Sequence, residues 1–146
     1  MSWYYSQAAC VLLVNRQGEL LLQLRDNDPH TWFPNHWGLI GGTVEPGETV
    51  EQGLLRETLE EVGEVLTDYA FFGMAKTMYV DIHVYIARLD KPAETIPLTE
   101  GQCVRYFSPQ ESLRLPLVPW LGRMIPELPG SALYRDLWAD NESAAR

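Results

Sequence analysis

The chain has little of what disulfide-rich, nucleic-acid-binding or membrane-spanning proteins need. It contains two cysteines among 146 residues, too few for a disulfide framework. It has 11 basic and 20 acidic residues and a formal net charge of −9, so no broad basic surface can neutralise a nucleic-acid backbone. Its longest apolar run covers residues 8–14, far short of the about 20 residues that cross a bilayer. We therefore expect no nucleic-acid partner and no membrane span.

The composition and the N-terminal residues favour a soluble, cytoplasmic domain. Apolar residues make up 46% and charged residues 21%, which is typical of a globular protein. The first basic residue is Arg16, so the basic segment that opens a secretory signal is missing. Cys10 and Cys103 stand in apolar or strand-like surroundings, as buried thiols in a reducing compartment do. We expect one domain over residues 1–140 and a flexible tail over 141–146.

Apolar periodicity and turn residues predict a mixed α and β fold. Two strands joined by a tight turn form a hairpin near the N-terminus, and a loop carrying Trp32 and Phe33 follows it. A short extended segment then leads into Gly41 and Gly42. The predicted strands cover residues 8–14, 19–25, 36–40, 69–74, 78–89 and 104–107, and short helices are predicted near residue 109 and over 119–125 and 131–139.

One longer helix is predicted for residues 50–62, with Thr49 as its N-cap and Gly63 at its C-terminal end. At 100° per residue the apolar side chains form one narrow arc, which predicts the buried face: Leu55, Leu59 and Val62. Four carboxylates then fall on the opposite, exposed face at i, i+3, i+4 and i+7: Glu57, Glu60, Glu61 and Glu64.

The acidic residues are concentrated around this helix. Seven glutamates and one arginine give residues 45–64 a charge of −6, out of −9 for the chain. Like charges at i, i+4 destabilise a helix by roughly 0.2–0.5 kcal/mol per pair, and the helix dipole disfavours anions near the C-terminal end. A hard cation would offset both costs, because Mg²⁺ takes oxygen ligands and bridges carboxylates to substrate phosphates. The alternative is a solvated acidic face without a ligand.

The residues before the helix favour the metal-binding interpretation. Gly41 and Gly42 follow a strand and allow a backbone carbonyl or amide to approach a ligand closely. Pro46 and Gly47 are turn residues, so the segment over 43–48 folds back toward the helix. In that arrangement Glu48 can reach Arg56 and hold the loop over the helix.

This stretch resembles the box of the Nudix hydrolase family, G-x5-E-x7-R-E-U-x-E-E-x-G-U, in which U is a bulky aliphatic residue. All seven fixed letters are present at the correct spacing: Gly42, Glu48, Arg56, Glu57, Glu60, Glu61 and Gly63. Two aliphatic positions depart from the pattern, at Thr58 and Glu64. Farther along, Glu100-Gly101-Gln102 resembles the segment in which MutT-like members supply a loop glutamate. The resemblance implies an α/β fold, an α/β/α sandwich around a mixed sheet in a single domain.

The resemblance also implies an activity. Family members hydrolyse a diphosphate bond in a nucleoside diphosphate linked to another group, such as a nucleoside triphosphate or a nucleotide sugar, with Mg²⁺ or Mn²⁺ as cofactor. The implied metal ligands are the Gly41 carbonyl and the carboxylates of Glu57, Glu60, Glu61 and Glu100. Either Glu57 or Glu100 is the implied general base, and the sequence does not choose between them. Arg56 and Glu48 are implied to position the catalytic groups.

Two other functions stay open. An isomerase like isopentenyl diphosphate isomerase resembles Nudix proteins but uses a cysteine, and neither Cys10 nor Cys103 stands beside the box. A non-catalytic nucleotide-binding Nudix domain usually lacks box glutamates, which are intact here. His83 is expected to be a half-buried, hydrogen-bonded residue or to border the cleft. Three alternative roles are open for the aromatic residues at the N-terminus and in the loop: stacking on a base, covering a core edge, or forming a homodimer interface. These residues are Trp3, Tyr4, Tyr5, Trp32 and Phe33.

Overall fold

A central strand, β1 (Ser6–Val14), organises the sheet, because its residues 9–14 are buried on both faces. The computed structural model describes residues 6–139. In it β1 pairs antiparallel with β2 (Leu20–Leu24) and β4 (Ile40–Thr43), and parallel with β6 (Val80–Arg88). The β1–β4 register places Cys10 opposite Gly41, which matters for the site.

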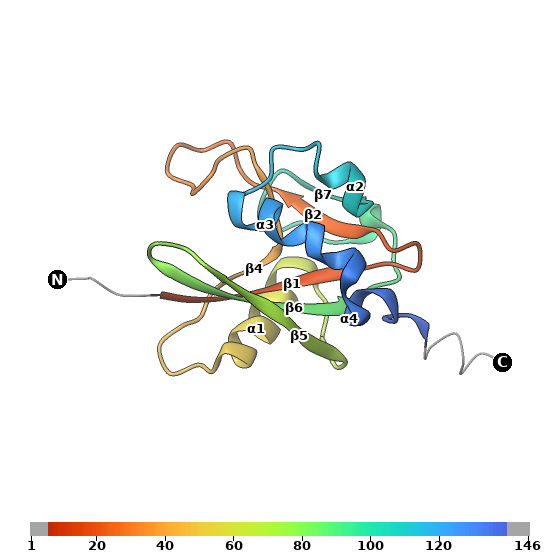
Figure 1. Cartoon of the computed structure of the whole chain (residues 1–146). Coiled ribbons are helices and arrows are strands. Elements are labelled where there is room, and N and C mark those ends of the chain that lie inside the picture. The colour runs from red at the N-terminus through yellow and green to blue at the C-terminus, as the bar shows by residue number, and fades with distance from the viewer. Residues whose placement is uncertain (1–5, 140–146) are drawn as a thin grey trace.

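Three further strands complete a seven-stranded mixed sheet (Figure 1). These are β3 (Trp37–Gly38), β5 (Tyr69–Lys76) and β7 (Cys103–Phe107). The main order is β3-β2-β1-β6-β5, with β4 added on β1 and β7 on β2. β1 and β2 form the predicted hairpin, and the predicted alternation along β6 holds, since Ile82, Val84 and Ile86 share one core while Tyr85 joins the other.

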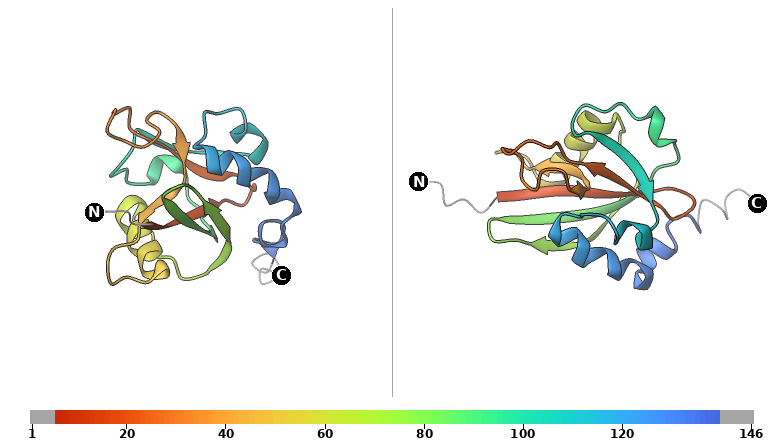
Figure 2. Two further views of the ribbon diagram at one scale, coloured as in Figure 1. Left: turned by 60° about the vertical axis from the view of Figure 1, so that its left-hand side comes forward. Right: turned by 90° about the horizontal axis from the view of Figure 1, so that it is seen from above.

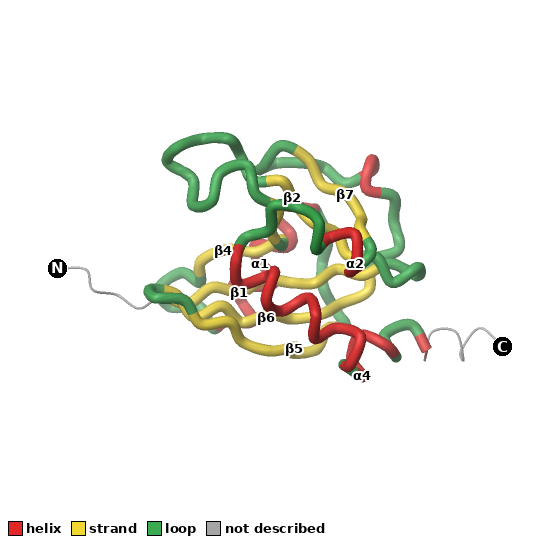
Figure 3. The backbone as a smooth tube through the Cα atoms, turned by 45° about the horizontal axis from the view of Figure 1, so that its top comes forward, coloured by secondary structure: helices red, strands yellow, loops and turns green. Residues whose placement is uncertain are grey.

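Helices cover both faces of the sheet, so the molecule has three layers (Figures 2 and 3). On one face α1 (Val50–Val62) packs through Leu54 and Val62. On the other, α3 (Pro119–Met124) and the 3₁₀ helix η2 (Ile125–Gly130) pack through Leu121, Ile125 and Leu128. The shorter elements are η1 (Ala93–Thr95), α2 (Pro109–Ser112) and α4 (Ala132–Arg135). The α/β/α sandwich is confirmed.

The ends of α1 are those that the sequence predicts. The Thr49 side chain accepts a hydrogen bond from the Gln52 backbone N–H at 3.1 Å, and the Gln52 side chain accepts one from the Thr49 N–H at 2.8 Å. This reciprocal capping box satisfies two N–H groups that a helix start leaves unpaired. At the other end Gly63 takes a left-handed conformation, and its N–H donates to the Leu59 carbonyl.

The predicted buried face of α1 is confirmed for Val62 and wrong for Leu55 and Leu59. Leu59 is 51% exposed and Leu55 is half-buried, whereas Leu54, Thr58 and Glu61 are buried together with Val62. The prediction from the apolar arc placed the buried face of α1 incorrectly because it assumed that every glutamate faces solvent. Glu61 instead accepts a hydrogen bond from the backbone N–H of Gly41, which draws it beneath β4.

The C-terminal region differs from the prediction in extent. The helix predicted over 131–139 is shorter, since α4 ends at Arg135 and turns follow. No helix within residues 6–139 is long and apolar enough to cross a membrane. The N-terminal aromatics Trp3, Tyr4 and Tyr5 and the tail predicted over 141–146 lie outside the described residues.

Replacing Thr58 by Val should stabilise the protein. Thr58 is fully buried, and its hydroxyl donates to the Leu54 carbonyl at 2.7 Å. That carbonyl keeps a backbone partner inside the helix, so the nearly isosteric change leaves no buried group unpaired and adds apolar contact. We expect the free energy of unfolding to rise by about 1 kcal/mol in urea titrations. A loss of stability would show that the hydroxyl is needed.

Candidate active site

Two glycines allow the backbone of β4 to lie directly against its neighbours, Gly41 against β1 and Gly42 against α1. At Gly41, whose φ is +149°, an added Cβ would lie 2.2 Å from the Ala9 carbonyl oxygen. At Gly42 an added Cβ would lie 2.7 Å from Oε1 of Glu57. A side chain at Gly41 would therefore collide with β1, and one at Gly42 would collide with a carboxylate of α1. This close approach sets the position of the carboxylates.

Glu61 is the most buried of the box glutamates, at 3% exposure. Its Oε2 accepts a hydrogen bond from the Gly41 N–H at 3.2 Å. The pKa of Glu61 is raised to about 9, chiefly by burial and also by the hydrogen bond with Glu57 and the charges of Glu100 and Glu57. The Gly41 N–H opposes that shift. The expectation that Glu61 lies on an exposed helix face is therefore wrong.

Arg56 connects the loop over residues 43–48 to the helix carboxylates. It binds Glu48 through two hydrogen bonds, Nε to Oε2 at 2.6 Å and one terminal nitrogen to Oε1 at 3.0 Å. Its other nitrogen lies 3.0 Å from Glu57 and 3.2 Å from Glu60. The Arg56 hydrogen bonds lower the pKa of the Glu48 carboxyl, and Glu48 raises the pKa of the guanidinium. The predicted pairing of Glu48 with Arg56 is confirmed.

The structure brings some of the predicted metal ligands together and leaves others apart. Glu57, Glu61 and the Gly41 backbone form one group. Glu60 is 58% exposed and directed to Arg56, while Glu100 is exposed but close enough for its charge to act on Glu61. Within residues 6–139 no three His, Cys, Asp or Glu side chains already form a metal-binding cluster. The donors are all oxygens, as a hard cation requires, and adjacent carboxylates leave an unbalanced negative charge.

Two residues that the sequence reasoning missed also lie at this site. Strand pairing places Cys10 opposite Gly41, so the expectation that no cysteine stands beside the box is wrong in three dimensions. Only the strand register reveals this neighbourhood. The pKa of the Cys10 thiol is raised to about 12, chiefly by burial and also by the charge of Glu61, against an opposing effect of Arg25. Arg25 is therefore a cation near the acidic group.

The remaining polar candidates have structural partners. Nε2 of His83 lies 2.5 Å from the Gln7 side-chain oxygen, and the imidazole lies beside Phe71, so it is half-buried and hydrogen-bonded as one alternative expected. Glu64 forms an ion pair with Lys91 rather than joining the box carboxylates. In the loop after β2, Arg25 donates through Nε to the Trp32 carbonyl, and Trp32 is 71% exposed.

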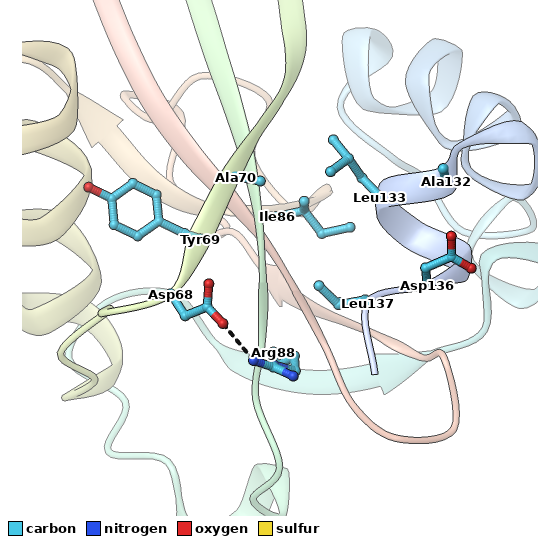
Figure 4. A pocket seen from close by; sticks show the side chains of 9 residues that line it. All are labelled: Asp68, Tyr69, Ala70, Ile86, Arg88, Ala132, Leu133, Asp136 and Leu137. Carbon is cyan, nitrogen blue, oxygen red and sulfur yellow. Dashed lines mark hydrogen bonds and ion pairs between the residues drawn. The ribbon is translucent and has the colours of Figure 1, made fainter. Parts of the chain in front are cut away.

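A separate hollow of about 390 Å³ lies between β5, β6 and α4 (Figure 4). Its wall combines the Asp68–Arg88 ion pair with apolar side chains such as Leu133 and Leu137. None of the predicted catalytic or metal-binding residues lines it. The hollow is on the face of the sheet opposite α1, so it is distinct from the acidic site.

The chain is similar in sequence to known proteins over the region of the acidic site and beyond. A family model described as the NUDIX domain matches residues 4–128. Nucleoside triphosphatase NudI from Salmonella schwarzengrund (strain CVM19633) and from Salmonella agona (strain SL483) are each 47% identical over 57 residues. That alignment covers 39% of this chain and 39% of each relative.

The fold is similar to those of solved proteins over most of its length. A MutT protein from Methanosarcina mazei Go1 superposes with a TM-score of 0.77 and 22% identity, covering 87% of this chain and 94% of that one. DR0079 from Deinococcus radiodurans has a TM-score of 0.72 and 21% identity, with 84% and 82% of the two chains covered. At these identities the likeness shows the fold alone.

Replacing Gly53 by Ala tests how tightly the loop packs on α1. Helix propensity alone predicts a gain of up to about 1 kcal/mol. However, an added Cβ would lie 3.2 Å from both Cγ2 of Val44 and Oε1 of Glu48, and hydrogen bonds from Glu45 and Arg56 hold that oxygen. We therefore expect a net loss of about 1 kcal/mol in the free energy of unfolding. A gain would show that the loop yields freely.

Replacing Glu61 by Gln should stabilise the metal-free protein, and more so as the pH rises. The raised pKa of Glu61 means that wild-type stability falls between about pH 4.5 and pH 9, because the unfolded chain releases this proton first. Gln stays neutral and keeps an acceptor for the Gly41 N–H. Its advantage should grow by up to about 1.4 kcal/mol per pH unit in that window, measured by denaturation in a metal chelator. A constant difference between pH 5 and pH 8 would contradict the burial argument.

Proposed function

The chain belongs to the NUDIX domain family, and from that premise we propose that it is a divalent-metal-dependent pyrophosphohydrolase acting on a nucleoside diphosphate derivative. Nucleoside triphosphates are the substrates of choice, because the aligned NudI relatives are described as nucleoside triphosphatases. A small molecule is thus its proposed partner. One observation carries the proposal: Glu57 and the buried Glu61 lie side by side, Glu57 against Gly42 and Glu61 against the Gly41 backbone.

Two adjacent carboxylates of low exposure are costly unless a positive charge lies between them. A divalent ion meets that need, and we assign Glu57, Glu60, Glu61, Glu100 and the Gly41 carbonyl to hold it. Bound Mg²⁺ or Mn²⁺ would supply positive charge for the diphosphate and lower the pKa of a water molecule. The exposed carboxylate of Glu60 must turn from Arg56 to take part, which an exposed side chain can do without repacking the core.

The protein's own groups supply positioning and proton transfer. Arg56 touches Glu57 and, through Glu48, holds the loop that follows Gly42, so a substrate phosphate would meet carboxylates in fixed places. A carboxylate, Glu57 or Glu100, accepts the proton of the attacking water. The exposed Glu100 can change its orientation more easily than Glu57, which Arg56 holds at 3.0 Å.

The decisive experiment is a substrate panel with the purified full chain. The eight common ribo- and deoxynucleoside triphosphates, together with nucleotide sugars, are incubated with Mg²⁺ or Mn²⁺, and phosphate and pyrophosphate are measured. We expect turnover of at least one triphosphate, abolished by chelator. Tight nucleotide binding without turnover would favour the non-catalytic alternative and overturn the proposal.

The position of Cys10 favours testing a second function, isomerisation of isopentenyl diphosphate. Its thiol lies beside Gly41, where a substrate diphosphate would bind. Its raised pKa keeps the thiol neutral at physiological pH, which suits neither a strong nucleophile nor a thiolate base. Incubation with isopentenyl diphosphate and Mg²⁺ separates the two functions, because an isomerase would form dimethylallyl diphosphate and release no phosphate.

Glu57→Gln and Glu100→Gln identify the general base. If Glu100 is the base, Glu100→Gln should lower kcat by about 10²-fold or more with little change in KM, because proton acceptance matters in the transition state. Glu57→Gln should lower kcat and should weaken Mn²⁺ binding more than Glu100→Gln does, because Glu57 is held beside the buried Glu61 whereas Glu100 is exposed. Unchanged kcat in Glu100→Gln would assign the base to Glu57 and leave Glu100 as a surface residue.

A further inference from the structure

We propose that Gln23, a buried residue of β2, is a positioning residue. It holds the Glu100 loop, residues 99–102, in a fixed position relative to α1. The inference deepens the proposed function, since Glu100 is a candidate base there. Gln23 is 5% exposed, and its Nε2 donates a hydrogen bond to the Glu100 carbonyl oxygen at 2.9 Å. A buried amide is expensive unless it is paired, so this contact is specific rather than incidental.

Gly101 allows the loop to lie flat on β2. Its φ is +82°, and an added Cβ would lie 2.9 Å from Cγ of Gln23 and 2.9 Å from the Leu24 carbonyl oxygen. Only glycine therefore fits, both in conformation and in space. The side chain of Gln23 fills the space that a residue at this position would otherwise occupy.

Further hydrogen bonds tie both sides of the loop to the rest of the fold. On the β2 side, the Gln102 N–H donates to the Leu24 carbonyl at 2.8 Å, and the Gln102 side chain donates to the Arg25 carbonyl at 2.8 Å. On the helix side, Oγ1 of Thr99 donates to the Glu60 carbonyl at 2.9 Å. The loop therefore bridges β2 and the C-terminal end of α1.

This arrangement fixes the backbone of Glu100 while leaving its carboxylate exposed. The carboxylate lies near enough to Glu61 for their charges to interact. Of the contacts described here, the Gln23 bond is the one made to Glu100 itself. Loss of that bond should free the Glu100 backbone, so the carboxylate would spend less time facing Glu57 and Glu61.

The first test is a double-mutant cycle of Gln23→Leu and Glu100→Gln, with the best triphosphate of the panel as substrate. Leu keeps most of the volume and removes the donor. We expect Gln23→Leu to lower kcat at least 10-fold with KM changed less than threefold, and the double variant to lose no more than Glu100→Gln alone. Ser112→Ala is the matched control, because it also removes a buried hydrogen bond to a backbone carbonyl, at 2.6 Å, but in α2. It should leave kcat unchanged.

Multiplicative losses in the double variant would overturn the proposal, since Gln23 would then act independently of Glu100. An unchanged kcat in Gln23→Leu, with Glu100→Gln impaired, would overturn it as well. Gly101→Ala provides a second variant that leaves Gln23 in place but lifts the loop from β2, and it should lower kcat in the same way.

A second measurement decides the inference even if no triphosphate is turned over. Amide hydrogen exchange of the metal-free protein reports the loop directly through the Gln102 N–H. Gln23→Leu should speed exchange there at least 10-fold relative to the strand residues of β7, and Ser112→Ala should not. Unchanged exchange at Gln102 would overturn the positioning role, whereas failure of the substrate panel alone would overturn only the proposed activity.

Discussion

The close approach of the β4 backbone to α1 is the constraint on which the rest of the site depends. Gly42 leaves no Cβ between strand and helix, Gly41 leaves none between β4 and β1, and the Gly41 N–H donates to the buried carboxylate of Glu61. A helix held this near cannot turn its acidic residues outward without breaking that bond. The fold thereby buries one glutamate, Glu61, although the loss of hydration disfavours a buried carboxylate.

The unfavourable free energy of placing carboxylates close together is concentrated at Glu57 and Glu61 rather than spread along α1. Glu61 and Glu57 share the interior position, while Arg56 compensates Glu57, Glu60 and Glu48 from the surface side. Arg56 suits this role because its planar guanidinium binds several oxygens at once and stays charged. No comparable cation pairs with Glu61 among the ion pairs of residues 6–139, so the inner carboxylate is where a divalent ion would relieve the most unfavourable charge.

Much of the fold was predictable because its signals are local. The cap at Thr49, the stop at Gly63 and the alternation along β6 each depend on a few neighbouring residues, and all are confirmed. The buried face of α1 was not predictable, because the burial of Glu61 depends on a hydrogen bond from Gly41, 20 residues away. The place of Cys10 beside Gly41 depends likewise on a strand register that no local pattern encodes. The turn residues before α1 predicted the pairing of Glu48 with Arg56, whereas the proposed role of Gln23 depends on contacts that are visible only in three dimensions.

The four carboxylates of the proposed site differ in how freely they can move. Glu57 and Glu61 are held by hydrogen bonds from Arg56 and Gly41, and displacement of Glu61 would leave the Gly41 N–H without this acceptor. Glu60 and Glu100 have exposed side chains, but hydrogen bonds hold their backbones. The Glu60 carbonyl accepts one from Thr99, and the Glu100 carbonyl accepts one from Gln23. In the proposed active site, two inner carboxylates would hold an ion and two outer ones would move with a substrate. Because these two hydrogen bonds are made to backbone atoms, substitutions in the Glu100 loop can change the positions of the Glu60 and Glu100 carboxylates while Glu57 and Glu61 stay in place.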